Sequence, residues 1–357
     1  MVPPINYLRW ATRHYGRVSY DLGRSGVYGR DRPALGVPSD LESFEHWDEL
    51  RARIARYNGV ADDEALPVLG ASHGLYIAYA TLLSPGDEVL IERVTYEPMH
   101  RIAEGIGANV ATFERSAACR FALDPAAVAR SITDRTRVIA VTNLHNPGGV
   151  RADEAALHEV ARLAAATGAH VLVDEVYAPF GSLCDARAVW GKSARNLAPN
   201  VVAVGSLTKC YGLGAHRVGW VLGPRDVIAR AEDALVASLG HAPVPWMAFG
   251  LRAFDRLPAF AEWSRATMAG KSRRVEAWFA SRPHFAWSTA REGLFGFAVD
   301  LRAQDDLTPR IEQGVRDHGV IVAPGAFFGV PNAFRLAWSI EDDKLDEALV
   351  RLGRIVD

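Results

Sequence analysis

Short apolar runs separated by segments of helical periodicity constrain the fold of this chain more than any other feature of its sequence. Continuous apolar strands are buried on both faces, and in parallel sheets they alternate with helices that cover those faces. Helical periodicity lies between several of the runs, for example over residues 155–166. The runs are residues 88–91, 109–113, 138–141, 170–173, 201–204 and 218–221. We therefore predict the α/β class, with a large domain in which helices sandwich a mostly parallel sheet.

The pattern changes after about Asp233, which indicates a second domain with mixed helices and strands. Residues 1–39 are rich in Gly and Arg and show little periodicity, so we expect them to wrap onto this second domain as an N-terminal arm. The expected elements are a helical stretch after Pro245, strands at 294–301, 320–322 and 334–336, and helices that start at Thr308 and Asp342. We predict a large domain at residues 40–235 and a smaller α+β domain formed by residues 1–39 and 236–357.

The composition is that of an ordinary enzyme. The formal net charge is −2, which gives no sign of a nucleic-acid or membrane surface. The N-terminus lacks the pattern of a signal peptide, and no apolar run approaches the ~20 residues of a membrane span. The three cysteines are scattered without metal-ligand spacing, as expected in a reducing compartment. We predict a cytoplasmic protein with no metal, nucleic-acid or membrane partner.

Lys209 carries the clearest chemical signal. It follows an apolar run within Ser206-Leu207-Thr208-Lys209, and a Gly-rich turn and Arg217 come after it. This arrangement suits a Schiff base with an aldehyde cofactor, whose phosphate the Ser206 hydroxyl and the Arg217 guanidinium would bind. The chain has four lysines among its 40 Lys and Arg residues, and arginine cannot form an imine. The alternative interpretation is a solvated surface lysine and a surface arginine.

Two more segments place polar side chains after predicted strands. Asp174 follows the run 170–173, where a buried carboxylate needs a partner such as a protonated pyridine nitrogen. Tyr177, three residues on, would reach the phenolic oxygen of the same ring. Asn146, in the turn Asn-Pro-Gly-Gly, would point its amide at that ring oxygen. The alternatives are a helix N-cap or a salt bridge for Asp174 and a simple turn for Asn146.

Two further segments would complete a cofactor site. A helix opens after Gly70, and its free N–H groups, with the small Ala71 and Ser72, would form a phosphate cradle. Tyr96 follows another predicted strand and would stack on an aromatic ring. Because ligands bind at the carboxyl ends of strands in open α/β sheets, we expect all these residues to meet there. A plain helix start and a core tyrosine are the competing interpretations.

In this order and spacing, the motifs resemble the class I and II aminotransferases, which are fold-type I enzymes dependent on pyridoxal 5'-phosphate (PLP). The resemblance covers nearly the whole chain, and it implies transfer of the amino group of an L-amino acid to a 2-oxo acid. The matching segments are residues 50–57, 84–89, the Asn-Pro-Gly-Gly turn, 174–177, Ser206-x-x-Lys209 with Arg217, 291–296, and 323–329 followed by 334–336.

The resemblance also implies a role for each candidate residue. Lys209 would form the Schiff base and act as the general acid and base, while Asp174 binds the pyridine nitrogen. Tyr96 would stack on the ring, and Arg335 would bind the substrate carboxylate. The other expected contacts are Ala71, Ser72, His73, Asn146, Tyr177, Ser206 and Arg217 to the cofactor, and Gly26 and Asn146 to the substrate. The family and the N-terminal arm together imply a homodimer with shared active sites.

Two segments depart from the family pattern. The family often has a tyrosine shortly before the Leu50-Arg51 pair, where it reaches the partner's phosphate, but residues 37–42 contain none and Tyr28 lies farther upstream. The stretch Arg24-Ser25-Gly26-Val27 stands where the family has a glycine loop over the substrate. The sequence of this segment is similar to that of family members that catalyse elimination or cyclisation. The alternative function is therefore a PLP-dependent lyase or cyclase, catalysing β- or γ-elimination or replacement, or capreomycidine-synthase-like cyclisation.

Two other classes fit the residues less well. A PLP-sensing transcription regulator carries an N-terminal helix-turn-helix domain, for which we expect no room before the family match. A Rossmann dehydrogenase needs Gly-x-Gly-x-x-Gly after a strand, whereas Gly212-x-Gly214 continues with Arg217 in the third place. The substrate side chain cannot be assigned, because too many arginines are candidates for binding a distal carboxylate.

Overall fold

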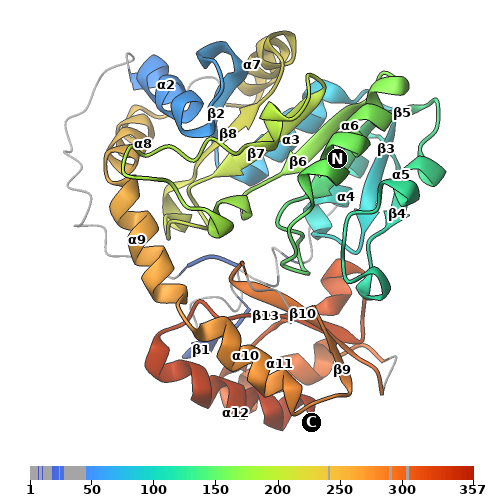
Figure 1. Cartoon of the computed structure of the whole chain (residues 1–357), viewed down its shortest axis with the longest axis vertical. Helices are drawn as coiled ribbons and strands as arrows, with labels where there is room; N and C mark the ends of the chain where they lie inside the picture. The colour runs from blue at the N-terminus through green and yellow to red at the C-terminus, as the bar shows by residue number, and fades with distance from the viewer. Residues whose placement is uncertain are drawn as a thin grey trace.

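The structure is a computed structural model that describes residues 7, 10, 18–23, 25–27, 46–239, 242–288, 292–302 and 305–357. Its described part contains one seven-stranded sheet, one four-stranded sheet and one two-stranded sheet. Figure 1 shows the large sheet with its helices above and the small sheets with theirs below. The α/β class predicted from the sequence is confirmed.

The large sheet is mostly parallel. Its strand order is β2-β8-β7-β6-β5-β3-β4, and β8 runs antiparallel to both of its neighbours. The pairs β7–β6, β6–β5, β5–β3 and β3–β4 are all parallel. The sequence pattern had indicated every strand of this sheet except β2. The strands are β2 (Ala65–Leu69), β3 (Glu88–Arg93), β4 (Asn109–Glu114), β5 (Thr136–Thr142), β6 (His170–Asp174), β7 (Val201–Ser206) and β8 (Val218–Leu222).

Helices cover both faces of this sheet, which explains why its strands are apolar throughout. On β5, Val138 and Ala140 belong to one core cluster while Ile139 and Val141 belong to another. The first cluster is closed by α3 (Ala71–Leu82), α4 (Glu97–Ile106) and α7 (Arg225–Leu239), and the second by α5 (Pro125–Ser131) and α6 (Glu154–Ala166). The Asp124 carboxylate caps α5 by accepting from the Ala126 N–H at 2.9 Å, as its position before a proline predicts.

A third core cluster lies at the β2–β8 side of the sheet. It contains side chains of α2 (His46–Asn58), α8 (Val244–Asp255) and α9 (Leu257–Met268) around Trp220. The α2–α8 contact is close, since a Cβ on Gly250 would lie 2.9 Å from Leu50 Cδ1. Both α7, which continues to Leu239, and α8 therefore pack on the large sheet beyond the boundary predicted at residue 235.

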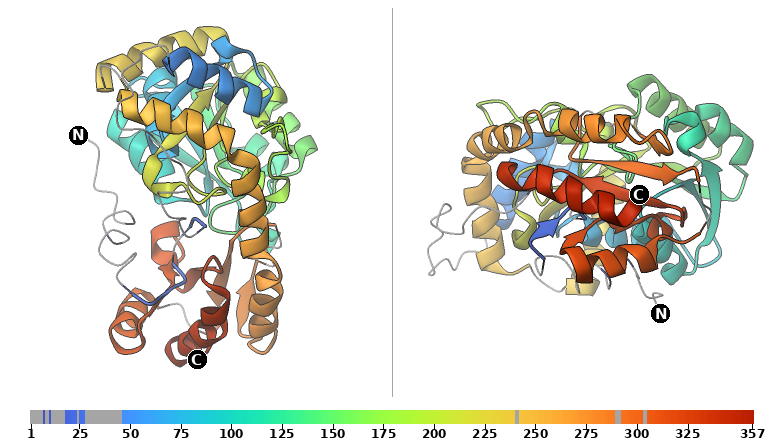
Figure 2. Two further views of the ribbon diagram at one scale, coloured as in Figure 1. Left: turned by 90° about the vertical axis from the view of Figure 1, so that its left-hand side faces the viewer. Right: turned by 90° about the horizontal axis from the view of Figure 1, so that it is seen from below.

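The smaller part of the molecule is built on the antiparallel sheet β12-β13-β10-β9. One apolar cluster joins this sheet to its helices, and the view from below in Figure 2 shows α12 lying across this end. β1 (Tyr20–Asp21) of the N-terminal arm pairs in parallel with β11 (Val320–Ile321). The other elements are α10 (Lys271–Ala280), β9 (Phe285–Trp287), β10 (Phe295–Asp300), α11 (Thr308–His318), β12 (Ala323–Pro324), β13 (Ala333–Ala337) and α12 (Leu345–Val356).

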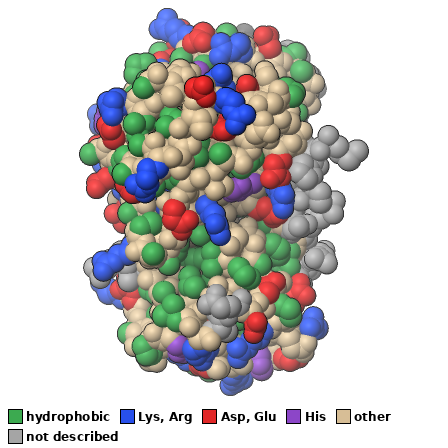
Figure 3. All heavy atoms as spheres, turned by 90° about the vertical axis from the view of Figure 1, so that its right-hand side faces the viewer, with side chains coloured by type: hydrophobic (Ala, Val, Ile, Leu, Met, Phe, Trp, Pro, Cys, Tyr) green, Lys and Arg blue, Asp and Glu red, His purple; other side chains and the backbone are tan. Residues whose placement is uncertain are grey.

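Two further features concern the surface charge and the length of the helices in the described part of the chain. On the face drawn in Figure 3, acidic and basic side chains are interspersed, in keeping with the balanced charge of the chain. Among the helices of the described ranges, none combines the length and the apolar character needed to cross a membrane.

Candidate active site

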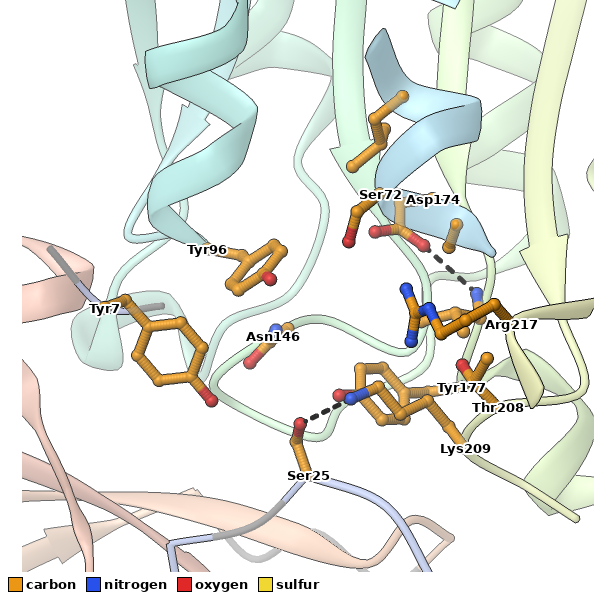
Figure 4. A pocket seen from close by; sticks show the side chains of 13 residues that line it. Tyr7, Ser25, Ser72, Tyr96, Asn146, Asp174, Tyr177, Thr208, Lys209 and Arg217 are labelled. Atoms are coloured by element: carbon orange, nitrogen blue, oxygen red, sulfur yellow. Dashed lines mark hydrogen bonds between the residues drawn. The ribbon is translucent and has the colours of Figure 1, made fainter. Parts of the chain in front are cut away.

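A cavity of about 630 Å³ lies at the carboxyl edge of the large sheet, between the two parts of the molecule. Figure 4 shows side chains from both parts pointing into it. Parallel strands end at the same edge, so residues far apart in the sequence converge there. The lining residues are Tyr7, Ser25, Ala71, Ser72, Leu75, Tyr96, Asn146, Asp174, Val176, Tyr177, Thr208, Lys209 and Arg217.

Lys209 follows β7 and extends its side chain into the cavity. Its Nζ atom donates a hydrogen bond to Ser25 Oγ at 2.9 Å, and the two side chains point toward each other in Figure 4. Burial, and after it the positive charges of Arg335 and Arg217, lower the pKa of the Lys209 amine to about 7. A large fraction of this amine is therefore uncharged near neutral pH and able to act as a base or a nucleophile.

Asp174 is the last residue of β6, and its side chain is buried. Burial raises the pKa of this carboxyl to about 6, against the opposing effects of the Val176 N–H and of Lys209. The Val176 N–H donates to Asp174 Oδ1 at 3.2 Å. Burying a charged carboxylate at the edge of a cavity costs free energy, and a cationic ligand in the cavity would reduce that cost.

The start of α3 forms one end of the cavity. Gly70 is its N-cap without a side-chain cap, so the first N–H groups of the helix, at Ala71 and Ser72, face the site without a competing side-chain oxygen. Gly70 has φ +81°, and a Cβ there would lie 2.6 Å from Arg217 Nη2. Glycine thus lets the Arg217 guanidinium lie against the helix start, which makes an anion site.

Asn146 lines the opposite side of the cavity, and the Arg335 side chain lies next to it, outside the lining. Arg335 lies on β13 and is fully buried, and its Nη1 donates to Asn146 Oδ1 at 2.7 Å. Its Nη2 donates to the Tyr7 hydroxyl at 2.7 Å and to the Gly23 carbonyl at 3.1 Å. The guanidinium also lies over the Phe295 ring, 5.0 Å from the centroid. A guanidinium fixed in this way presents a planar fork suited to a carboxylate.

Tyr96 and Tyr177 line the cavity between these groups. Tyr96 is the N-cap of α4, and its ring meets the edge of the Tyr7 ring at 5.5 Å. Tyr177 follows Asp174 in the turn after β6, and its ring packs edge-on against Phe295 at 4.8 Å. Burial, as the largest cause, raises the pKa of both phenols, so both are neutral hydroxyl groups.

Four expected site residues lie beside the cavity rather than in its lining: Arg335, described above, and His73, Ser206 and Gly26. His73 Nδ1 accepts from the Leu69 N–H at 3.2 Å, and its ring faces Ser238 on α7. Ser206 Oγ lies 2.6 Å from Thr208 Oγ1, and Thr208 is the residue of this pair that lines the cavity. Gly26 packs on the lysine, because a Cβ there would lie 3.6 Å from Lys209 Cδ.

The sequence interpretation did not single out Tyr7, Ser25, Thr208, Leu75 or Val176 as lining residues. Thr208 and Val176 each adjoin an expected residue, so a signal for them existed in the Lys209 and Asp174 motifs. Tyr7 lies in an arm without periodicity, where no local pattern points at the cavity. Three residues of the segments that match or depart from the family pattern lie outside the described residues, namely Arg24, Tyr28 and Arg291.

A family model described as aminotransferase class I and II matches residues 40–352. The chain belongs to this family. The match covers most of the chain and includes every motif from α2 to the strand that carries Arg335. The resemblance inferred from the motifs is therefore confirmed, and with it a PLP-dependent enzyme of the aminotransferase fold.

Several known proteins are similar to this chain along most of its length. Capreomycidine synthase of Streptomyces vinaceus is 28% identical over 371 aligned positions, which cover 96% of this chain and 91% of that protein. Histidinol-phosphate aminotransferase of Sphingopyxis alaskensis is 35% identical over 83% of this chain and 77% of its own. A crystal structure of a PLP-dependent aminotransferase from Streptococcus suis superposes with a TM-score of 0.88, covering 99% and 98% of the two chains at 21% identity.

The cavity fits the cofactor of this family. The helix start of α3 with Arg217 matches the chemistry of a phosphate group, and buried Asp174 matches that of a protonated ring nitrogen. Lys209 supplies an amine that is partly uncharged near neutral pH, because its pKa is lowered to about 7. Within the described residues, no group of three or more His, Cys, Asp and Glu side chains is arranged to hold a metal ion.

Proposed function

We propose that this enzyme transfers the amino group of an L-amino acid to a 2-oxo acid. The proposal is supported by the convergence of Lys209, Asp174 and Arg217 on one cavity, beside which the Arg335 guanidinium is hydrogen-bonded to the lining residue Asn146. Bound PLP would supply an aldehyde for the amino group and a ring that withdraws electrons from the substrate. Ser72, the N–H groups at the start of α3 and Arg217 would hold its phosphate.

Different side chains of the protein would bind the cofactor ring, bind the substrate and transfer the proton. Asp174 would keep the ring nitrogen protonated, with Tyr177 and Asn146 near the ring oxygen and Tyr96 against the ring. Arg335 would bind the substrate carboxylate through paired hydrogen bonds. The Lys209 amine would take the proton from the substrate Cα and return it to the cofactor side, a transfer for which its lowered pKa suits it near neutral pH.

A PLP-dependent cyclase or lyase is the second candidate function. It is favoured by the similarity to capreomycidine synthase along 96% of the chain. Both reactions begin with the same proton removal by Lys209. They differ afterwards, because elimination or cyclisation expels a leaving group from the substrate before a proton returns.

One experiment separates the two functions. Purified enzyme is incubated with single L-amino acids, with and without a 2-oxo acid, and the products are identified by mass spectrometry. Transamination predicts a new 2-oxo acid together with amination of the added acceptor, and ping-pong kinetics with parallel double-reciprocal lines. A dehydrated or cyclic product that forms without any 2-oxo acid would replace the proposal with the second candidate.

We also propose a homodimer in the cytoplasm with active sites shared between subunits. The dimer is what membership of the aminotransferase family implies, whereas the described arm residues Ser25 and Tyr7 contact the site of their own chain. The three cysteines, all free, support a reducing compartment. Light scattering at micromolar concentration tests the dimer, and the mass of one chain, 38.9 kDa, would refute it.

The division into domains is likewise a proposal. We place the large domain at residues 40–235 and the small domain at residues 1–39 and 236–357. The packing of α7, α8 and the start of α9 on the large sheet favours a C-terminal boundary farther along the chain, at α9. Limited proteolysis tests the boundary, since a first cut after α9 would support the later position and a first cut near residue 235 the earlier one.

A further inference from the structure

Residues 20–23 and 25–27, here named the N-terminal strap, connect the small sheets with the catalytic lysine. At one end, the Leu22 N–H donates to the Ile321 carbonyl at 2.8 Å and the Leu22 carbonyl accepts from the Ala337 N–H at 2.9 Å. At the other end, the Val27 N–H donates to the carbonyl of Lys209 at 3.2 Å. The strap is therefore fixed by backbone hydrogen bonds on both sides of the cavity.

Ser25 lies between these two anchors, and its hydroxyl is directed at the reacting amine. The residue is 6% exposed, and Ser25 Oγ accepts from Lys209 Nζ at 2.9 Å. The same hydroxyl lies near the Tyr177 phenol, where it opposes the rise in the pKa of Tyr177 that burial causes. A buried amine needs a hydrogen-bond partner, and a serine held by its backbone provides one without a further loss of chain entropy.

The strap also packs along the lysine side chain and touches the carboxylate-binding group. Gly26 approaches Lys209 Cδ, as described above, and the Gly23 carbonyl accepts from Arg335 Nη2. The strap thus limits where the Lys209 methylenes can lie, and the amine points toward Ser25. Both contacts come from residues of the strap and not from the Lys209 motif.

We propose that Ser25 is a positioning residue for Lys209, which holds the ε-amine whenever that amine is not joined to the cofactor. The proposal rests on the proposed function, in which the free amine takes the proton from the substrate Cα and gives it back. In that cycle the amine must leave the cofactor and wait within reach of the substrate. Ser25 fixes the waiting position, so that the proton passes from Cα to Nζ and back over a constant path.

The charges around Nζ give the hydroxyl a measurable effect. Arg335 from β13 and Arg217 before β8 oppose the charged ammonium, whereas Asp174 on β6 and the Cys210 thiol favour it, with the neutral Tyr177 phenol alongside. An oxygen that accepts from the ammonium also favours the charged form. Removing this oxygen should therefore lower the pKa of Lys209 further.

The test is competitive labelling of the full-length, cofactor-free protein with trace acetic anhydride across pH, read by mass spectrometry. The chain has four lysines, so Lys209 is resolved from Lys192 and Lys344, which serve as internal references. For Ser25→Ala we expect the labelling pKa of Lys209 to fall by about one unit, the size of one hydrogen bond to a charged group. Equal titration of Lys209 in the two proteins would overturn the proposal.

Two further variants separate positioning from folding. Ser25→Cys preserves the size of the side chain but offers a weak acceptor, so it should shift the titration of Lys209 as Ser25→Ala does. Ser288→Ala is the matched control, because Ser288 is also 6% exposed but accepts from the Phe297 N–H in the small sheet. It should leave the Lys209 titration unchanged, and a shift equal to that of Ser25→Ala would count against the proposal.

The outcome is independent of whether the proposed function holds. A visible absorbance band that appears when PLP is added to the wild-type protein, and that borohydride removes, reports on the cofactor assignment alone. If the band appears but Ser25→Ala leaves the labelling pKa of Lys209 unchanged, only the positioning role of Ser25 is refuted. A Ser25 effect without any band would refute the proposed function while leaving the contact between Ser25 and Lys209 established.

Discussion

The two sides of the cavity differ in how the chain builds them. The side that we propose for the cofactor consists of Lys209, Asp174, Arg217 and the start of α3, each located at the carboxyl edge of one sheet within a short recognisable motif. The side that we propose for the substrate is assembled from the N-terminal arm and the neighbouring β13, so that Tyr7 and Arg335 meet across 328 residues of sequence. Local sequence determines the first side, whereas the second depends on how the two parts of the molecule pack together.

Lys209→Ala should have the largest effect if the chemistry resides on the cofactor side. Loss of the nucleophile and of the general base should reduce turnover by ~10³-fold or more. It should also abolish the PLP band that borohydride removes, whereas Lys192→Ala, at an exposed lysine, should retain it. Absorbance spectra before and after reduction provide the measurement. A Lys209→Ala protein that is still reduced onto another lysine would contradict the assignment.

Asp174→Asn should lower turnover by ~10²-fold while leaving PLP bound. The amide preserves the shape of the side chain but cannot stabilise a protonated ring nitrogen, so an electrostatic contribution is lost. Steady-state kinetics at saturating PLP, together with the content of bound PLP, measure the two effects separately. Full activity in this variant would mean that the carboxylate is structural.

Arg335→Lys tests the proposed substrate side. We expect a smaller loss of activity than in the two preceding variants, and no loss of bound PLP. The substitution keeps the charge but removes the planar fork, so kcat/KM should fall roughly 10–100-fold. The PLP band should remain as in the wild type, because Arg335 is not among the residues that line the cavity. Loss of the band in Arg335→Lys would show that the two sides are not separable.

The smallest effect concerns stability in the absence of the cofactor. The pKa of Asp174 is raised to about 6 by burial, so the folded chain holds this proton more tightly than the unfolded chain does. The contribution of Asp174 to stability is then fully present below the ordinary carboxyl pKa and is lost as pH rises through about 6. Asp174→Asn should therefore raise the Tm of the cofactor-free protein at pH 8 by a few degrees, and should change it little at pH 4. An equal Tm for the two proteins at pH 8 would contradict the burial cost of this carboxylate.

The same contrast explains what the sequence could reveal about the fold and the site. The apolar runs predicted six strands of the large sheet, because strands buried on both faces leave a continuous signal. β2 was missed because Pro67 interrupts its short apolar run. His73 and Ser206 were selected by their place in a motif, yet their side chains turn to Ser238 and Thr208. Side-chain direction depends on packing, which a motif does not encode.

The contacts of Arg335 have a consequence for selectivity. In the structure both terminal nitrogens of its guanidinium are already engaged by neutral oxygens, those of Asn146, Tyr7 and Gly23. On its proposed role, a substrate would bind by exchange and would have to outcompete a phenol, an amide and a peptide carbonyl for the same donors. A carboxylate can do so because its hydrogen bonds to a cation are stronger than those of neutral acceptors, whereas an amino-acid amide or ester brings no such advantage. If Arg335 has its proposed role, the arm would therefore select ligands by charge before any of the chemistry begins.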